Sequence, residues 1–380
     1  MPELLLELFS EEIPARMQKR ASGDLKRLVT GGLKSAGLEF TSAEAYATPR
    51  RLVLIVYGLP VKQPDVREER RGPRADAPEK AINGFKGSLP DGTEVEKRET
   101  DKGMFLYAVV DKKGTDSVAV ISALVPDVIR SLQWPKSMRW AETEIRYVRP
   151  LQSVTCVFAG TMLTGKVDLG RGQQLAFGTH VRGHRFHAPE PFTVSSFDTY
   201  RDGLANAKVM LDPAERRAKI DGDLSALAEE AGLAVREDLA LLDEVAGLVE
   251  WPVVLLGTID DAFMDVPDEV LITSMRSHQK YFSLLNADGS LAPSFGVVAN
   301  MEADDGGSAI VAGNERVLRA RLADAKFFWD QDRKETLASK APSLKGMVFH
   351  AKLGTLDKKV DRVQALAAEI ATHVPGADRD

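Results

Sequence analysis

The sequence has almost no cysteine and no long apolar run. Cys156 is the only cysteine in 380 residues, which excludes an intramolecular disulfide and a zinc site built from several cysteines. No uncharged apolar stretch approaches the roughly 18–20 residues that cross a bilayer, and the opening segment carries glutamates where a secretion signal needs positive charge. We therefore expect a soluble, cytoplasmic chain that does not bind a membrane.

Neither sign of charge dominates the chain, but the charges are unevenly distributed. The 50 basic and 56 acidic residues give a net charge of −6. Residues 130–190 hold 9 basic and 4 acidic side chains, whereas residues 191–310 hold 8 and 22. Because RNA responds to local basic surface more than to net charge, an RNA partner would bind residues 130–190 or the helix predicted near 315. Segregation of charge without function explains the same pattern about as well.

Strand-like and helix-like patterns are mixed along the chain. Strands are predicted at the runs ELLLELF, RRLVLIVYGL, MFLYAVVD, EIRYV and QSVTCVFAG, with a strand, a turn and a second strand over 281–300. Helices are predicted between residues 14 and 37, at 118–132, at 212–232, after 267, from about 315, and at 354–373. We therefore favour an α+β fold with mixed or antiparallel sheets over an alternating parallel fold.

The length allows two or three domains, each large enough to bury a core of its own. We predict an α+β region at 1–150, a second α+β region at 151–310, and a basic helix followed by the incomplete start of a helical domain at 311–380. Residues 62–80 contain three prolines and dense charge. Such a stretch neither buries area nor continues a ladder readily, so we predict an exposed loop or arm there.

The sharpest apparent motif runs from Gly160 to Lys166 and fits the pattern G-x-x-x-x-G-K of a phosphate-binding loop. That loop also needs Ser or Thr at the next position to hold magnesium, and Val167 stands there. The residues that follow continue a strand-like pattern rather than opening a helix. A turn between strands therefore explains the glycines better than a nucleotide site does.

Three histidines, His180, His184 and His187, lie within eight residues. The spacing suggests a metal site, because neutral imidazoles are common zinc ligands. A glycine between them weakens a helix, however, and no glutamate lies between the first two histidines as in the H-E-x-x-H motif. We predict no metal site; a loop in which Arg182, His184 and Arg185 meet a phosphate or a partner carboxylate, and simple structural hydrogen bonding, both stay open.

A dense set of polar groups, including His278 and Lys280, lies where a predicted helix passes into a strand. Side chains at such a junction can converge on a cleft, although local capping explains the same residues. No acidic residue near His278 in the sequence suggests a triad, and Cys156 has no neighbouring base. We therefore predict no catalytic residue in this chain.

The helix predicted from about residue 315 has two different faces. Its apolar face should be core and comprises Leu318, Leu322, Ala325 and Trp329. Basic side chains on another face suit phosphate oxygens and comprise Arg316, Arg319, Lys326 and Arg333. Acidic residues are interspersed among them, so a salt-bridged surface explains this face at least as well as an RNA contact does.

Short phrases spread along the whole chain are specific when taken together. They are LLLELFSEEIPARM (4–17), ATPRRL (47–52), MRW (138–140), YVRP (147–150), GHRF (183–186), the stretch from EV to EWP (244–252), HQKYF (278–282), GNERVLRARL (313–322) and KLGT (352–355). With these phrases in this order, the sequence resembles from end to end the β subunit of the bacterial heterotetrameric glycyl-tRNA synthetase.

The resemblance implies a heterotetrameric α2β2 enzyme. In that enzyme a class II catalytic core on the α subunit activates glycine with ATP, and the β subunit helps to bind and position tRNA. ATP and magnesium are accordingly expected at the α subunit, and no cofactor is expected in this chain. The family's β subunit is also considerably longer than 380 residues and carries an anticodon-binding domain in its C-terminal part. We therefore expect this chain to be an N-terminal portion, in which residues 354–373 begin a helical domain resembling the HD fold.

Charge and position within the quoted phrases give the site candidates. The RNA-binding or interface candidates are Arg139, Arg149, Arg182, His184, Arg185, His278, Lys280, Arg316, Arg319, Lys326 and Arg333. On this interpretation the chain supports glycine–tRNA ligase activity by binding tRNA and the catalytic α subunit. The alternative is an RNA-binding or assembly scaffold without activity in this shortened form.

Overall fold

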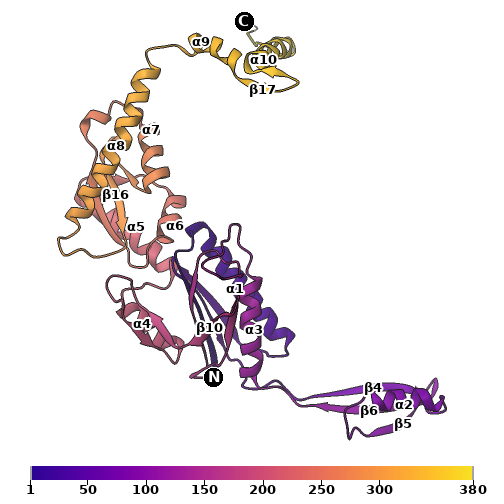
Figure 1. Ribbon diagram of the computed structural model, residues 1–380. Helices are drawn as coiled ribbons and strands as arrows, with labels where there is room; N and C mark the ends of the chain where they lie inside the picture. The colour runs from indigo at the N-terminus through magenta and orange to yellow at the C-terminus, as the bar shows by residue number, and fades with distance from the viewer. Residues whose placement is uncertain (1, 379–380) are drawn as a thin grey trace. The chain divides into compact units, whose positions relative to one another are not determined.

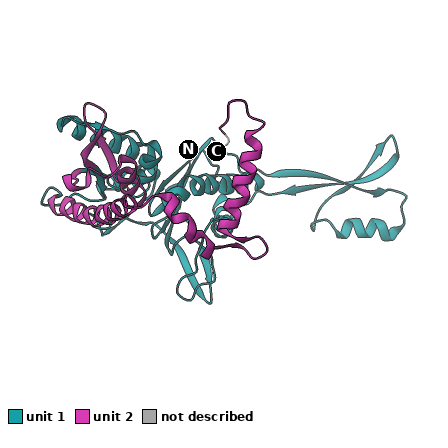
Figure 2. Ribbon diagram, turned by 90° about the horizontal axis from the view of Figure 1, so that it is seen from above, with its two compact units in different colours: residues 1–255, 296–307 teal, residues 256–295, 308–380 magenta. Residues whose placement is uncertain are grey.

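A computed structural model of the chain describes residues 2–378, in which helices and strands are mixed along the whole length (Figure 1). The predicted α+β class is confirmed. Two compact units make up the chain: unit 1 comprises residues 1–255 and 296–307, and unit 2 comprises residues 256–295 and 308–380 (Figure 2). The domain borders predicted near residues 150 and 310 stay predictions. Between residues 2 and 378, no helix is both long and apolar enough to cross a membrane.

Unit 1 is built around one large sheet. Its strands outside the arm described below are β1 (Glu3–Ser10), β2 (Ser42–Thr48), β3 (Arg51–Tyr57), β7 (Leu151–Phe158), β8 (Thr161–Met162), β9 (Lys166–Gly170), β10 (Gln173–Gly178), β11 (His180–Arg182), β12 (Pro191–Thr193) and β13 (Ala234–Val235). Its helices there are α1 (Ala15–Ser35), α3 (Ser117–Ser131), α4 (Phe197–Asn206), α5 (Pro213–Glu230) and α6 (Leu239–Ala246).

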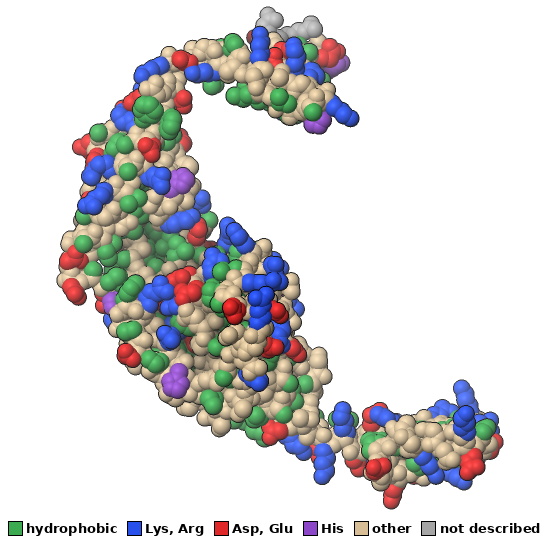
Figure 3. Space-filling view, in the orientation of Figure 1, with side chains coloured by type: hydrophobic (Ala, Val, Ile, Leu, Met, Phe, Trp, Pro, Cys, Tyr) green, Lys and Arg blue, Asp and Glu red, His purple; other side chains and the backbone are tan. Residues whose placement is uncertain are grey.

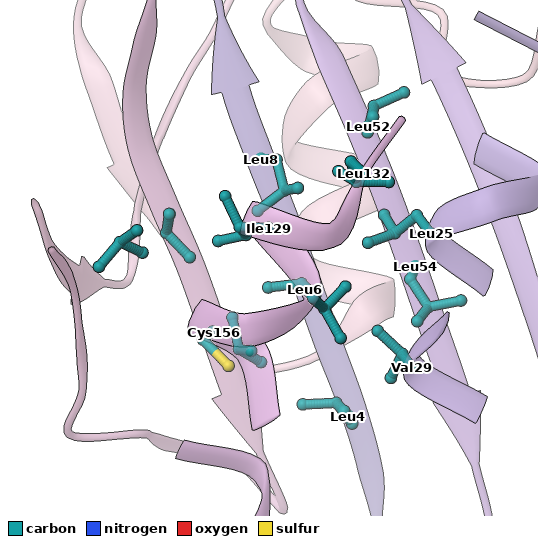
Figure 4. Packing of buried hydrophobic residues seen from close by; sticks show 14 of the residues in the cluster. Leu4, Leu6, Leu8, Leu25, Val29, Leu52, Leu54, Ile129, Leu132 and Cys156 are labelled. Carbon is teal, nitrogen blue, oxygen red and sulfur yellow. The ribbon is translucent and has the colours of Figure 1, made fainter. Parts of the chain in front are cut away.

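The large sheet has the strand order β2-β3-β1-β7-β10-β9, with β8 paired to β7. Its paired strands are antiparallel, except that β10 runs parallel to β7. Side chains alternate across a strand, so Leu4, Leu6 and Leu8 of β1 join the core formed with α1 and α3, as Figure 4 shows for Leu6. Leu5 joins a second core that includes side chains of α4. Burial on both faces explains why β1 is a nearly continuous apolar run.

Most of the elements predicted for unit 1 are present, but the run EIRYV is not a strand. Residues 144–148 form only an isolated bridge, between Tyr147 and Met138, and two of their backbone N–H groups donate to the carbonyl of Leu169. The segment from Gly160 to Lys166 passes through β8 into β9. No helix follows it directly, so the structural requirement for a phosphate-binding loop is not met.

The arm of unit 1 consists of β4 (Val66–Arg74), α2 (Glu79–Gly87), β5 (Val95–Thr100) and β6 (Gly103–Lys112), with the antiparallel strand order β4-β6-β5. Within residues 62–80, for which an exposed loop or arm is predicted, β4 is mostly exposed and is a strand rather than a loop. Its charges do not prevent pairing, because they face water and can pair across the sheet: Arg67 lies 3.7 Å from Asp111, the residue directly opposite it on β6. Pro73 falls at the irregularity between Arg71 and Arg74, where a missing N–H is tolerated. Acidic and basic side chains alternate over the arm (Figure 3).

Unit 2 contains the hairpin and the long helix predicted from the sequence. Strands β15 (Phe282–Leu285) and β16 (Leu291–Ala299) are neighbours, and β14 (Val253–Thr258) lies beside β16; β14 and β16 cross the sequence border between the units. The remaining elements are α7 (Asp268–Ser274), a turn of π-helix (Met275–Gln279), α8 (Ser308–Asp332), α9 (Leu337–Lys340), β17 (Val348–His350), β18 (Gly354–Thr355), α10 (Leu356–Ala371), and short 3₁₀ turns at Asp261–Phe263 and Ala341–Gly346.

Arg216 on α5 is fully buried in unit 1 and is held by backbone carbonyl groups. Its Nε donates to the carbonyl of Ala246 at 2.9 Å, and its Nη1 donates to those of Met210 and Leu211 at 2.7 and 2.9 Å. Its Nη2 donates to the carbonyl of Ala47 at 2.7 Å. Burial lowers the pKa of this guanidinium to about 10, so that it is still charged at neutral pH. One cation therefore joins α5 to α6 and to β2.

We predict that Arg216→Met destabilises the chain by about 3–5 kcal/mol, because four buried carbonyls lose their donors. Arg217→Met is the matched control on the same helix. Arg217 is more exposed and pairs with Asp243 at 2.8 Å, and such a surface pair contributes about 0–1 kcal/mol. Urea unfolding of both variants measures the difference. Equal losses for the two variants would contradict the prediction.

Candidate functional site

Arg51, at the start of β3, is fully buried and joins two carboxylates in unit 1. Its Nη1 lies 3.3 Å from Oε2 of Glu7 on β1, and its Nε lies 3.0 Å from Oε1 of Glu250. Thr48 donates its hydroxyl to that same oxygen of Glu250 at 2.6 Å. The two carboxylates come from positions 44 and 199 residues away from Arg51, so the cluster ties together distant parts of the chain.

The two carboxylates of this cluster are compensated unequally. Tyr200 donates its hydroxyl to Oε2 of Glu7, but Oε1 of Glu7 has no hydrogen-bond partner among the described residues. Burial therefore raises the pKa of Glu7 above its usual 4.5, although Arg51 opposes the shift. Burial acts on Glu250 in the same direction, but Arg51 and the Thr48 hydroxyl outweigh it, and the pKa of Glu250 is lowered. Glu250 is thus the principal counter-ion of Arg51.

Several of the phrases that carry the family resemblance meet around this cluster. Glu7 belongs to the first phrase, Thr48 and Arg51 to ATPRRL, and Glu250 to EWP. The phrase GHRF joins them, because the carbonyl of Gly183 accepts from Nη2 of Arg51 at 3.4 Å. A hydrogen bond joins the first phrase to YVRP. In it, the backbone N–H of Glu11 donates to the carbonyl of Pro150, the last residue of YVRP, at 3.0 Å. Segments that are far apart in the sequence therefore lie together around Arg51.

A second group of charged side chains, which we call the charged array, is less buried than the Arg51 cluster and contains both signs of charge. Nη1 of Arg185 lies 2.8 Å from Glu12, and its Nη2 lies 3.3 Å from Glu11. Glu11 also faces Arg50 at 3.5 Å and accepts a hydrogen bond from Gln152. Burial and the neighbouring Arg185 lower the pKa of Arg50. The array can exchange its internal pairs for a phosphate or for the charged groups of a partner.

The rings of His184 and His187 pack on each other, with 4.8 Å between their centres, and both accept backbone hydrogen bonds. His184 is fully buried, and its Nδ1 accepts from the backbone N–H groups of Phe186 and His187 at 3.3 Å. Burial lowers the pKa of His184. His187 accepts from the backbone N–H of Glu302 through Nε2 at 3.0 Å, whereas His180 lies exposed on β11. These bonds fit the structural interpretation, and the assignment of His184 as an RNA contact stays a prediction. No group of three or more His, Cys, Asp or Glu side chains suited to a metal occurs within residues 2–378.

The other arginine candidates of unit 1 lie at different positions. Arg139 is exposed in the segment after α3, and Arg182 is exposed on β11. Arg149 is half-buried, and its Nη1 donates to the carbonyl of Val148 at 2.8 Å. Arg185 is the candidate that the structure brings into the charged array. For all four residues, RNA binding stays a prediction.

In unit 2, the predicted core face of α8 is buried at two of its four positions, whereas Ala325 and Trp329 are half-buried. Leu318 and Leu322 are buried, which confirms the core face at these positions. On the basic face, Arg319 pairs with Asp260 at 2.6 Å, and Lys326 pairs with Asp265 at 2.6 Å. Arg319 and Lys326 are thus ion-paired, as the salt-bridged interpretation expects, and RNA contacts by these two cations and by the exposed Arg316 stay predictions. The remaining candidate on α8 is Arg333, whose guanidinium lies 5.7 Å from the ring centre of Trp329.

The junction after α7 in unit 2 is shaped by a backbone irregularity. One turn of π-helix ends at Gln279, and the next residue, Lys280, has a φ of 62° in the left-handed region. Tyr281, which follows Lys280, is buried and stacks on Phe295, with 4.5 Å between the two ring centres. Its hydroxyl donates to Oδ1 of Asn314 at 2.6 Å. His278 is exposed on the π-helical turn. The polar phrase HQKYF therefore links this junction to α8, and RNA contacts by His278 and Lys280 stay predictions.

Sequence reasoning missed the buried cluster and the buried cation of α5. The phrases containing Glu7, Arg51 and Glu250 were recognised, but their spacing gives no sign that the three side chains meet. Arg216 stands in the charged phrase AERRAK, which reads as a solvated helix face. A charged residue inside an otherwise apolar strand, such as Glu7 in LLLELF, is the one signal that pointed to a buried ion pair.

Comparisons with known proteins agree with the resemblance. Residues 4–379 match the family model described as glycyl-tRNA synthetase beta subunit. The chain is 49% identical to the glycine–tRNA ligase beta subunit of Rhodospirillum centenum, over 98% of this chain and 55% of that protein. Identity to the beta subunit of Paracoccus denitrificans is 48%, over 100% of this chain and 56% of that protein. The chain thus spans about half the length of the curated relatives that it matches.

The raised pKa of Glu7 predicts a pH-dependent stability. The folded chain binds this proton more tightly than the unfolded chain does, so the contribution of Glu7 is largest below its ordinary pKa of 4.5. It falls as the pH rises through 4.5 and on through the raised pKa. Glu7→Gln removes the titration, so the stability of the unmodified chain relative to Glu7→Gln should fall as the pH rises above 4.5.

Urea unfolding at a series of pH values between about 4 and 8 measures this difference. Glu39→Gln serves as the control for the same substitution at an exposed position. A stability difference for Glu7→Gln that stays constant or grows with pH would refute the assignment.

Proposed function

The chain belongs to the family of glycyl-tRNA synthetase beta subunits, and on this premise we propose that it supports the ATP-dependent attachment of glycine to tRNA. In this proposal it acts with a catalytic α subunit that holds ATP and magnesium, in an α2β2 assembly in the cytoplasm. Its own contribution is to bind tRNA and to contact the α subunit. The match of residues 4–379 to one family model is the observation that carries the proposal.

The geometry of unit 1 supports a role in binding and assembly. The phrases shared with the family meet around Arg51, where the charges are buried and paired, and such a cluster fixes the positions of strands and loops. The charged array around Glu11 and Arg185 lies at the edge of that cluster. A buried framework with an exchangeable charged edge suits a surface for a partner or for RNA.

The first test of the proposal is reconstitution. We expect glycylation of tRNA when this chain is mixed with purified α subunit, and no activity from either protein alone. The measurement is the rate of incorporation of labelled glycine into tRNA. The complete β subunit of a relative, mixed with the same α subunit, shows that the α preparation is competent.

A mixture that is inactive beside an active control would contradict the proposal for this chain. If the chain still bound tRNA or the α subunit in that case, the scaffold alternative would replace it.

The ion pairs on α8 predict which of its cations contribute to RNA binding. A phosphate bound by Arg319 must first displace Asp260, whereas the exposed Arg316 makes no ion pair among the described residues. We therefore expect Arg316→Gln to weaken tRNA binding and to lower the slope of log affinity against log salt by about one. Arg319→Gln, the matched variant three residues away, should change the slope less. Binding titrations at several salt concentrations test this, and an unchanged slope for Arg316→Gln would remove α8 from the RNA surface.

A further inference from the structure

Residues 183–188 of unit 1, which we call the GHRF turn, pack closely against the end of α4. The backbone N–H of His184 donates to the carbonyl of Ala207 at 2.9 Å, and the N–H of Ala188 donates to the carbonyl of His184 at 3.0 Å. A Cβ atom added to Gly183 would lie 2.6 Å from the Cβ of Ala207 and 2.7 Å from the carbonyl oxygen of Ala188. The turn therefore has little room to move while these contacts hold.

The side chain of His184 closes the turn from inside. It is fully buried, and its Nδ1 accepts from the backbone N–H groups of Phe186 and His187, both at 3.3 Å. A ring nitrogen that accepts hydrogen bonds carries no proton, so the neutral ring holds its proton on Nε2. The imidazolium form carries a proton on both nitrogens. Protonation would thus set an Nδ1–H donor against two backbone donors, and His184 makes these bonds only while it is neutral.

The neighbouring ring of His187 makes a contact of the same kind. Its centre lies 4.8 Å from that of His184, and its Nε2 accepts from the backbone N–H of Glu302 at 3.0 Å. Protonation of this nitrogen would replace an acceptor by a donor. Two charged rings at this spacing would also repel each other. The contacts of the pair therefore require both rings to be neutral.

The charged groups around the turn do not offset the burial of His184. Asn300 and Glu250 favour the protonated ring, but burial is the larger effect and lowers the pKa of His184 from its ordinary 6.5. The carboxylate of Glu250 is moreover bound by Arg51 at 3.0 Å. An open turn binds a proton on His184 more tightly than the closed turn does, so opening becomes more favourable as the pH falls below 6.5. The other charged or titratable groups in the turn or next to it are Arg182, Arg185, His187, Lys208 and Glu302.

We propose that His184 makes the GHRF turn acid-sensitive: a proton from solvent adds to its Nδ1, the turn opens, and Arg185 separates from Glu11 and Glu12. Arg185 belongs to the turn and lies 3.3 Å from Glu11 and 2.8 Å from Glu12, so the charged array depends on the closed turn. Phe186, which is 63% exposed, belongs to the same turn and moves with it. The inference involves neither RNA nor the α subunit and does not depend on the proposed function.

Amide hydrogen exchange of the 380-residue chain tests the inference, with each rate divided by the intrinsic rate at the same pH. Each pH unit below 6.5 makes opening up to tenfold more favourable. We therefore expect the amides of Phe186 and His187 to exchange about three- to tenfold faster at about pH 5.5 than at about pH 7.5. The Nε–H NMR signal of Arg185 should shift over the same interval.

His184→Asn should remove this pH dependence, because its side-chain oxygen can accept the two backbone bonds in place of Nδ1 and does not titrate. His180→Asn is the matched control, since His180 is exposed on β11, and it should keep the dependence. Amides of β1 report global unfolding, and their corrected rates should not rise with those of the turn. Equal rates at the two pH values, or loss of the dependence in His180→Asn, would overturn the proposal.

The ring signals of His184 in the unmodified chain give a second measurement, which decides the matter if circular dichroism shows that His184→Asn is not folded. Nitrogen chemical shifts should place the proton on Nε2 at neutral pH, and the ring should titrate with a pKa below 6.5. A proton on Nδ1, or a pKa at or above 6.5, would contradict the inference. Failed reconstitution of glycylation leaves these measurements unaffected, so the two outcomes are distinguishable.

Discussion

The buried guanidinium of Arg51 is the constraint on which the arrangement of unit 1 depends. Removing a charge from water costs several kcal/mol, and only well-placed partners offset that cost. Glu7 and Glu250 provide those partners, at 3.3 and 3.0 Å. Because Glu7 is fixed on β1 and Arg51 on β3, a slip of one residue between these strands would turn one member of the pair to the opposite face. The pair therefore specifies strand register as well as the position of the segment around Glu250.

The elements predicted correctly are those whose signal is local. β1 and β3 are apolar runs of strand length, and α5 begins with a side-chain cap, since Asp212 accepts from the backbone N–H of Ala214. The two differences arise from pairing that no local pattern contains. The run EIRYV has a strand composition but makes only one bridge, whereas the charged segment of β4 pairs along β6 and is a strand. A strand is thus defined by its partner as much as by its residues.

The same is true of the candidate site: the sequence shows a charged residue but not the residue that pairs with it. The sequence identified Arg185, Arg319 and Lys326 as cations on suitable segments, but their acidic partners come from elsewhere in the chain. Family resemblance supplied the phrases, and only the fold shows that several of them meet at Arg51. The sequence thus identifies which residues are basic, and only the structure shows which of them are already paired with a carboxylate.

The ion pairs already present in the chain also affect how strongly each arginine could bind a polyanion. A phosphate that approaches Arg185 or Arg319 competes with a carboxylate already within 3.3 Å. The free energy needed to separate that ion pair reduces the net binding energy of the phosphate. On the proposed function, a phosphate at Arg316 meets no such competition, because Arg316 makes no ion pair among the described residues. The number of basic residues in a segment is therefore a poor measure of its affinity for RNA. On the proposed function, the cations of each unit that lie apart from acidic side chains would therefore contribute most of the electrostatic attraction to RNA.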